Sequence, residues 1–158
     1  MITKILIPID GSEPANKALD LSIYLADKCS AEILVLSVME PKIIPVFTQT
    51  YAQPMEVPQI PPVSPAEMQS MLKRQRTSYE NLLATALNKS RKNYPNLKVS
   101  TKLAEGQPAD KIIETAKEGN FNMIVIGSRG LSGIKEFILG SVSNTVANKA
   151  NCPVLIVK

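Results

Sequence analysis

Residues 123–130 read Met-Ile-Val-Ile-Gly-Ser-Arg-Gly, four apolar residues followed at once by a glycine-rich turn. A short apolar run bounded by glycine is typical of a strand that is covered on both faces, as in a parallel sheet. Three further runs of this kind occur, at residues 5–7, 33–36 and 154–157. The stretch 97–103 differs, because apolar residues and threonine alternate there with lysine and serine, which predicts an edge strand with one face in water.

Helical periodicity fills the gaps between these runs. Apolar or small residues recur at helical spacing along residues 15–29, 68–87, 109–116 and 142–149. Strands that alternate with helices predict an α/β fold, here a Rossmann-like three-layer αβα sandwich around a five-stranded parallel sheet. With the third strand at an edge, the predicted strand order is 3-2-1-4-5. Such sheets bind ligands where the order reverses, which directs attention to the loops after Ile9 and after Ile126.

Length and composition narrow the classes of protein. The 158 residues, of which 44% are hydrophobic and 20% are charged, predict one domain over residues 1–158. Because the chain has no histidine and only two cysteines, Ser-His-Asp and Cys-His catalysis and the usual zinc sites are excluded. The start of the chain has no signal-peptide pattern and no apolar run approaches the length of a membrane span. A cytoplasmic protein without membrane contact is expected.

The net charge of +4 is concentrated in one segment. Residues 66–98 carry seven basic and two acidic side chains, whereas the rest of the chain carries 11 basic and 12 acidic ones. A functional basic patch is one interpretation, but a solvated helix face is favoured, because no aromatic stacking platform is interleaved with the charges. Nucleic acid is therefore not expected as a partner.

A proline-rich insertion interrupts the alternation at about residues 41–65. This stretch holds seven of the twelve prolines and hardly any charge, which predicts an extended loop. Loops of this length are commonly functional or mobile. Three interpretations stay open: a mobile or partner-contacting arm, a lid over a ligand, and a docking motif for a proline-reading domain.

The turn after the fourth strand and the helix that follows it have the features of a phosphate site. Gly127 and Gly130 let the backbone approach a ligand closely, and the residues from Gly140 onward place unpaired N–H groups at a helix start. The hydroxyls of Ser141 and Ser143 are predicted to cap this helix and to donate to phosphate oxygens. Helix caps and a tight turn without any ligand are the alternative. Neither a P-loop nor a G-x-G-x-x-G pattern is present.

A second candidate follows the first strand. Asp10 lies at the carboxyl end of that strand, where its carboxylate can accept a hydrogen bond from a ribose hydroxyl, help to hold a divalent cation, or simply stabilise a turn. Ser12 is predicted to cap the first helix. The residues alone leave the three interpretations of Asp10 open.

One spacing is specific: Gly127-x-x-Gly130 is followed after nine residues by Gly140-Ser141. This spacing is similar to the ATP-binding pattern of the universal stress protein family. The similarity extends to both ends of the chain through Lys4-Ile5-Leu6-Ile7-Pro8-Ile9-Asp10-Gly11-Ser12, Gly106-x-Pro108 and Cys152-Pro153-Val154-Leu155-Ile156-Val157. The resemblance implies the ATP-binding branch of this family and the fold of the adenine nucleotide alpha hydrolases, and it covers the chain except the proline-rich insertion.

The resemblance also assigns roles to individual positions. It implies that Asp10 contacts the ribose, that Pro8 and Ser12 belong to the same crevice, and that the backbone of Val38 reads adenine with Met39 beside it. It further implies a ribose and phosphate pocket shaped by Gly127, Arg129 and Gly130. The phosphates of ATP, with a Mg²⁺ or Mn²⁺ ion held mainly by them, would be bound by Gly140, Ser141, Val142 and Ser143.

Three functions are compatible with these features. The first is a nucleotide-dependent regulator or switch in the stress response. The second is a slow or partner-dependent ATP hydrolase, for which Arg129 or Lys135 supplies positive charge but no residue is evidently placed to orient water. The third is a protein-interaction module that does not depend on nucleotide. The resemblance also implies a homodimer that pairs through residues 154–157, while the protein partner stays unidentified.

Overall fold

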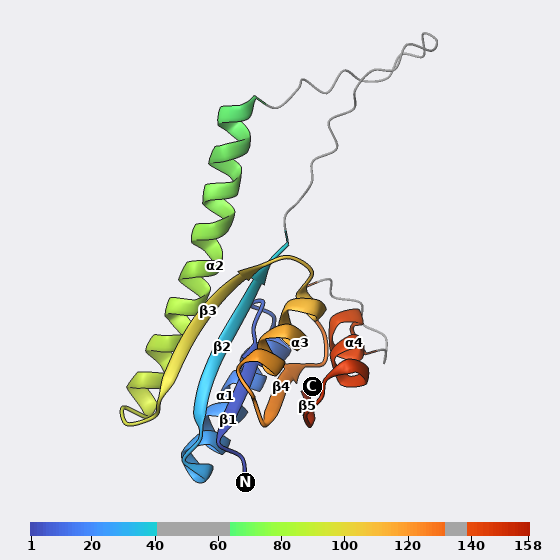
Figure 1. Cartoon of the computed structure of the whole chain (residues 1–158). Coiled ribbons are helices and arrows are strands. Elements are labelled where there is room, and N and C mark those ends of the chain that lie inside the picture. Colours follow the sequence, from blue (N-terminus) through green and yellow to red (C-terminus); the bar gives the residue numbers. More distant parts are fainter. Residues whose placement is uncertain (41–63, 132–138) are drawn as a thin grey trace.

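The computed structural model describes residues 1–40, 64–131 and 139–158. These residues form a parallel sheet with the strand order β3-β2-β1-β4-β5 (Figure 1). The strands are β1 (Lys4–Pro8), β2 (Glu32–Met39), β3 (Val99–Glu105), β4 (Met123–Gly127) and β5 (Val154–Val157). The predicted α/β fold and strand order are confirmed.

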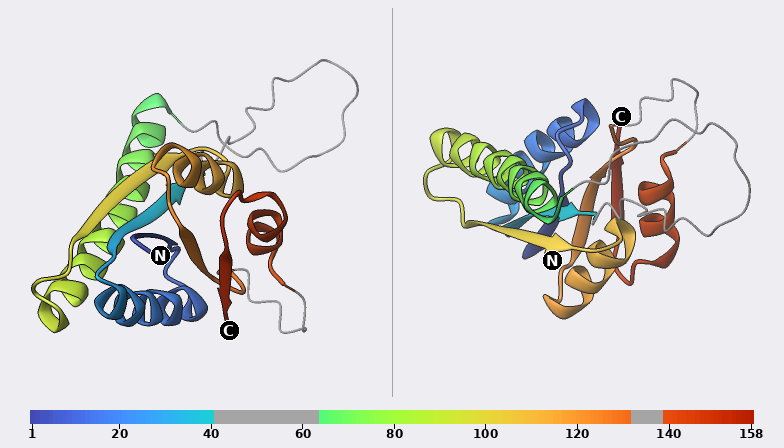
Figure 2. Two further views of the ribbon diagram at one scale, coloured as in Figure 1. Left: turned by 60° about the horizontal axis from the view of Figure 1, so that its bottom comes forward. Right: turned by 90° about the horizontal axis from the view of Figure 1, so that it is seen from above.

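Helices cover the sheet on both faces, which gives the three predicted layers (Figure 2). They are α1 (Glu13–Cys29), α2 (Pro65–Asn93), α3 (Pro108–Glu118) and α4 (Ser141–Lys149). The core on one face joins α1 and α2 to the sheet, and the core on the other face joins α3 and α4 to it. None of the helices in the described ranges combines the length and the apolar character needed to cross a membrane.

The central strand supplies both cores. Ile5 and Ile7 face α1 and α2, whereas Leu6 between them faces the opposite side, because side chains alternate along a strand. All three side chains are fully buried. Each contributes about 1.5–3 kcal/mol through burial, which explains why this strand reads as a continuous apolar run.

The bounds of one edge strand differ from the prediction, and both edge strands are less buried than the central ones. The third strand was expected at residues 97–103, but β3 begins and ends two residues later, where it pairs in register with β2 from Ile33 to Met39. Thr101, predicted to face inward, is exposed together with its neighbours. All four residues of β5 are only half-buried, but both faces of this strand are covered as expected, because Leu155 and Val157 pack against one core and Val154 and Ile156 pack against the other. Among the described strands, β5 has β4 as its one neighbour, because it lies at the other edge of the sheet.

Helix α2 begins inside the predicted proline-rich insertion. Pro65 is its first residue, and the Ser64 hydroxyl accepts a hydrogen bond from the Glu67 N–H while the Glu67 carboxylate accepts one from the Ser64 N–H. These two bonds form a capping box. The Ser64 N–H and the Ser64 hydroxyl both donate to the Glu67 carboxylate, which holds the pKa of Glu67 below its usual value. The remainder of the predicted insertion, residues 41–63, lies outside the described residues.

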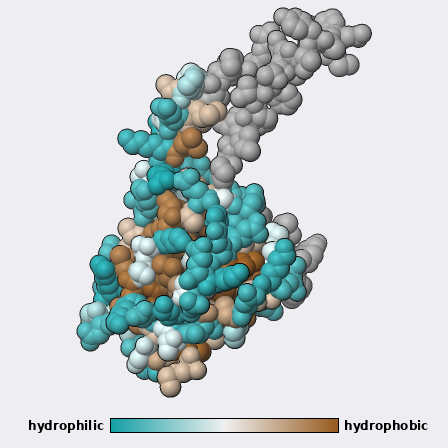
Figure 3. All heavy atoms as spheres, in the orientation of Figure 1, coloured by the Kyte–Doolittle hydropathy of each residue, from teal (hydrophilic) through white to brown (hydrophobic). Residues whose placement is uncertain are grey.

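Only the second half of α2 packs against the sheet. Leu83 and Ala86 are buried against β2 and β3, whereas Met71 and Leu72 are exposed although they continue the same helical stripe. The first half of the helix extends past the ends of the strands (Figure 1), and apolar atoms are visible on it among hydrophilic ones (Figure 3). The helix predicted over residues 68–87 is confirmed, but its apolar stripe is buried against the core only in the second half.

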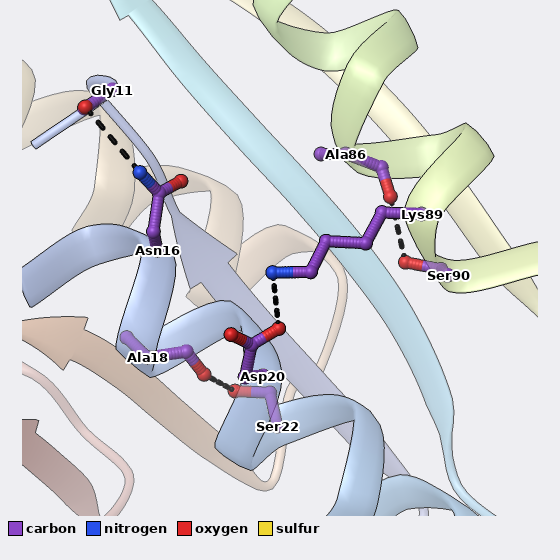
Figure 4. A network of polar contacts seen from close by, with 8 residues as sticks. All are labelled: Gly11, Asn16, Ala18, Asp20, Ser22, Ala86, Lys89 and Ser90. Carbon is purple, nitrogen blue, oxygen red and sulfur yellow. Dashed lines mark hydrogen bonds and ion pairs between the residues drawn. The ribbon is translucent and has the colours of Figure 1, made fainter. Parts of the chain in front are cut away.

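An ion pair joins α1 to α2, and two buried hydroxyls nearby are hydrogen-bonded within their own helices (Figure 4). The Lys89 ammonium lies 2.5 Å from the Asp20 carboxylate of the neighbouring helix. The buried hydroxyls of Ser22 and Ser90 each donate to a backbone carbonyl one turn earlier in their own helix, at 2.7 and 2.8 Å. Because the hydroxyls of these two serines are hydrogen-bonded within their own helices, such small side chains can be buried where the helices pack on the sheet.

Candidate functional site

A cleft of about 250 Å³ opens at the carboxyl ends of β1, β2 and β4, where the strand order reverses. The starts of α3 and α4 close one side of it, and Tyr79 of α2 reaches it from the other face of the sheet. Parallel α/β sheets bind their ligands at this position. The volume of about 250 Å³ lies just below the range of about 300–1,000 Å³ found for small-molecule sites.

Most of the residues predicted for the site meet in this cleft. Its lining includes Pro8, Asp10, Val38, Gly127, Arg129, Gly130, Gly140, Ser141, Val142 and Ser143. Ser12 and Met39 are outside the lining, and both are buried. Ser12 caps α1 as predicted, because its hydroxyl accepts a hydrogen bond from the Ala15 N–H at 3.4 Å. The same hydroxyl donates to the Arg129 carbonyl at 3.3 Å, so Ser12 supports the loop that lines the cleft.

Asp10 connects two loops. Its Oδ1 accepts a hydrogen bond from the Ser12 N–H at 2.9 Å across Gly11, which has a left-handed backbone with a φ of 88°. The other oxygen, Oδ2, lies so close to Gly130 that a Cβ on that glycine would be 2.8 Å from it. Asp10 therefore has two roles: Oδ1 stabilises the turn, and Oδ2 lies beside Gly130 at the cleft.

Gly127 makes a contact that the sequence pattern does not predict. A Cβ on this residue would lie 2.7 Å from the Ala15 nitrogen and 2.8 Å from the Pro14 carbonyl carbon, both in the first turn of α1. Real Cβ atoms do not come so close to backbone atoms. Gly127 therefore permits close packing of β4 against α1, in addition to lining the cleft.

The start of α4 differs from the prediction in its capping. The N-cap is Gly140, with no hydrogen bond from a side chain, so the prediction that Ser141 and Ser143 cap the helix is wrong. The buried Ser143 hydroxyl instead donates to the Gly127 carbonyl at 2.7 Å. The first intrahelical bond runs from the Asn144 N–H to the Gly140 carbonyl. The N–H groups of residues 141–143 consequently have no partner within the helix and form an end that attracts anions.

The contact of Ser143 predicts a stability difference between the two serines. Ser143→Ala should lower the free energy of unfolding by about 1–2 kcal/mol, because it leaves the Gly127 carbonyl without its buried donor. Ser141→Ala should change it by less than about 0.5 kcal/mol, because this side chain is exposed. Urea titrations followed by circular dichroism measure both values. Equal stability of the two variants would contradict the assigned role of Ser143.

Charges of both signs line the cleft. Asp10 and Glu40 contribute carboxylates, and Arg129 contributes a positive charge. The pKa of Glu13, on the first turn of α1, is lowered mainly by a hydrogen bond and the charge of Lys17 and to a smaller extent by the charge of Arg129. The positive charge of Arg129 therefore also acts, weakly, on Glu13 in the first turn of α1. Lys135, the other predicted source of positive charge, lies outside the described residues.

Several lining residues were not predicted from the sequence. They include the buried core residues Ile9, Leu36, Ile112 and Ile126, together with Glu40 and Tyr79. Pro108 lies in the Gly106-x-Pro108 landmark, but no role at the site was assigned to it. Tyr79 belongs to the helical stripe of α2, and this periodicity does not distinguish a core residue from a site residue.

Two other hollows occur at the opposite end of the sheet. One of about 390 Å³ lies beside Lys4, Glu32 and Phe121, and one of about 600 Å³ lies beside Asn93 and Lys98. Both lie near the amino ends of β1 and β2, away from the reversal of strand order, and we therefore assign the site to the smaller cleft. The described residues contain no cluster of three or more Cys, Asp or Glu side chains suited to a metal ion.

Comparisons with known proteins agree with this fold. The sequence pattern of the universal stress protein family matches residues 1–158 of this chain. The universal stress protein YxiE of Bacillus subtilis is 35% identical over 159 residues, covering all of both chains. The structure of UspA from Lactobacillus plantarum is 20% identical, with a TM-score of 0.78 over 99% of this chain and 98% of that one. A universal stress protein solved in complex with cAMP is 22% identical, with a TM-score of 0.67 over 99% and 96%.

Proposed function

Because the chain belongs to the universal stress protein family, we propose that it binds an adenine nucleotide, preferably ATP, in the cleft at the reversal of strand order. Nucleotide binding makes it a regulator or switch in the stress response. The structure of a related protein is described as a complex with cAMP, which supports an adenine nucleotide as the ligand.

One observation carries the proposal: a carboxylate, a glycine-rich turn and an open helix start lie around the same cleft. The N–H groups at the start of α4 suit the phosphates, because a helix amino end carries about half a positive charge. The carboxylate of Asp10 at the end of β1 suits a ribose hydroxyl as a hydrogen-bond acceptor. Val38, at the end of β2, borders the part of the cleft that would hold the base.

The lining fits a nucleotide that brings its own metal ion. The described part of the lining has two carboxylates against the single guanidinium of Arg129, and one oxygen of Asp10 is already bonded to Ser12. This set is too small to enclose Mg²⁺ or Mn²⁺ by itself, since such ions prefer about six oxygen ligands. The phosphates of ATP would supply most of these oxygens, and the ion would offset their negative charge.

Two hydroxyls beside the cleft favour binding over hydrolysis. Those of Ser12 and Ser143 donate to backbone carbonyls, so they serve the structure and are not free to position a water molecule. Phosphoryl transfer requires an oriented nucleophile in addition to charge neutralisation. We therefore propose a switch whose two states are the nucleotide-bound and the nucleotide-free protein.

Mass spectrometry of the denatured, freshly purified protein tests this function. We expect an adenine nucleotide to be released, and we expect added ATP in large excess to be recovered intact. Recovery of a different class of ligand would contradict adenine nucleotide binding. Steady release of phosphate by the purified protein would contradict the switch and favour the hydrolase.

We also propose that the protein is a cytoplasmic homodimer that pairs through β5. This strand is an apolar edge of the sheet, and its four residues are only half-buried in the single chain. A second copy would supply the hydrogen bonds and the cover that an exposed edge lacks. Sedimentation velocity at micromolar concentration should show a dimer, and a monomer would contradict the pairing. Cell fractionation tests the location, and recovery with membranes would contradict it.

A further inference from the structure

We propose that α2 forms a wall of the nucleotide site and that the ring of Tyr79 stacks on the adenine base. This inference rests on the proposed function and adds a residue that determines affinity for the base. Tyr79 is half-buried and contributes to the lining of the cleft. Among the described residues of that lining it is the one aromatic side chain.

The strand order places the base on the side of the cleft that α2 borders. Neighbouring strands lie about 4.8 Å apart, so the ends of β2 and β4 are separated by about 10 Å with β1 between them. The phosphate-binding turn follows β4, and Asp10 follows β1. A nucleotide laid across these ends in the order phosphate, ribose and base therefore brings its base to the end of β2. Val38 and Glu40 line the cleft there, and α2 packs against β2.

Polar contacts fix the turn of α2 that carries Tyr79. The Gln75 side-chain amide donates to the Glu40 carbonyl at 3.4 Å, which ties the helix to the end of β2. The Arg76 guanidinium forms an ion pair with Glu105 at the end of β3, and its other nitrogen lies 3.9 Å from Glu80. The two contacts that reach the ends of the strands come from positions four and three residues before Tyr79, about one helical turn away.

Apolar packing one turn further along α2 determines which face of this helix points toward the sheet and the cleft. Leu83, one turn after Tyr79, is buried against the sheet, and residues four apart lie on the same face of a helix. Leu82 lies against the loop that carries Asp10, since a Cβ on Gly11 would be 3.7 Å from its Cδ1. Tyr79 thus stands where the covered part of α2 ends and the cleft begins.

The chemistry of a phenol ring suits this position. The π-face of a base stacks on an aromatic ring with a gain that corresponds to roughly a five- to 160-fold change in affinity on substitution by alanine. Stacking acts on the base alone. The affinity for ATP should therefore depend on Tyr79, whereas the affinity for inorganic triphosphate, which has no base, should not.

Calorimetric titrations with ATP, and competition by inorganic triphosphate, test this assignment on the full chain. Tyr79→Ala should weaken ATP binding about tenfold or more and leave triphosphate binding unchanged. Tyr79→Phe should stay within about threefold of the wild type, because it keeps the ring. Tyr24→Ala is the matched control, since Tyr24 is 52% exposed on α1, does not line the cleft and lies beneath the Lys28 ammonium.

Three results would overturn the stacking role while leaving the proposed function intact. They are ATP binding by Tyr79→Ala equal to that of Tyr24→Ala, an equal loss of ATP and triphosphate binding, and a loss in Tyr79→Phe as large as in Tyr79→Ala. If Tyr79→Ala does not fold, as judged by circular dichroism, Tyr79→Leu takes its place with the same expectations. Failure of the folded wild type to bind ATP would overturn the proposed function itself.

Discussion

Replacing Gly127 by alanine should lower the free energy of unfolding by about 3 kcal/mol, and replacing it by valine should lower it further. The added Cβ would lie 2.7 Å from the Ala15 nitrogen and 2.8 Å from the Pro14 carbonyl carbon. These are backbone atoms of the first turn of α1, which the Ser12 hydroxyl caps, so they cannot move aside as a flexible side chain would. Overpacking of this kind costs about 1–3 kcal/mol where the surroundings can adjust, and domains are stable by only about 5–15 kcal/mol.

Gly130→Ala is the control for this effect. Among the described residues, a Cβ on Gly130 would meet the Asp10 Oδ2 alone, at the end of a side chain that can rotate. We expect its stability to stay within about 1 kcal/mol of the wild type. Urea denaturation followed by circular dichroism compares the two variants. A Gly127→Ala protein as stable as Gly130→Ala would show that β4 does not depend on this close approach.

The sheet was predictable because its central strands carry a strong and simple signal. Ile5, Leu6 and Ile7 are all fully buried, since helices cover both faces, and a continuous apolar run is the direct result. The polar residues of the third strand placed it at an edge, and that placement determined the strand order. The end residues of the strand were predicted less well, because Leu97 packs against the core before the pairing with β2 begins.

The covered length of α2 was not predictable from periodicity. Met71 and Leu72 continue the stripe of Leu83 and Ala86, yet only the second pair is buried. Helical spacing shows which face of a helix is apolar, but it does not show where the neighbouring strands end. For the same reason, the sequence did not identify Tyr79 as a residue of the cleft, since it lies where the covered part of α2 ends and the cleft begins.

The location of the cleft was largely predictable from the strand order, the glycine pattern and the family resemblance, because glycines and helix starts have local signatures. The partners of individual side chains were not. Ser143 was expected to act as a cap, but α4 begins at Ser141 with Gly140 as its N-cap, which directs the Ser143 hydroxyl to the Gly127 carbonyl. Such a contact depends on the position of a helix start to within one residue, and sequence patterns do not give that precision.

Replacing Gly130 by valine should abolish ATP binding, with an expected loss of at least about 100-fold in affinity, while the protein stays folded. The valine Cβ would lie within 2.8 Å of the Asp10 carboxylate, so either the carboxylate is displaced or the branched side chain fills the space beside it. Both outcomes remove the acceptor assigned to the ribose, and they narrow a cleft of only about 250 Å³. Loss of a hydrogen bond to a charged group alone corresponds to about 1.5–3 kcal/mol.

Gly130 is a sharper test position than Gly140. A Cβ on Gly140 would lie 3.3 Å from both the Arg129 Cα and the Ser128 carbonyl oxygen, so a larger side chain there presses on the backbone of the turn. A loss of binding in Gly140→Val would therefore combine blocked access with a distorted loop. Gly130→Val acts chiefly on the side chain of Asp10, so a loss of binding in this variant reports on access to the cleft and not on a distorted backbone.

Calorimetric titration of ATP, with Mg²⁺ present, into the wild type and Gly130→Val tests the central claim most directly. The thermal unfolding of both proteins is recorded alongside. We predict one ATP bound per chain of the wild type, no measurable binding to Gly130→Val, and closely similar unfolding temperatures. Binding of ATP to folded Gly130→Val with the affinity of the wild type, or no binding to the wild type at all, would contradict a nucleotide site in this cleft.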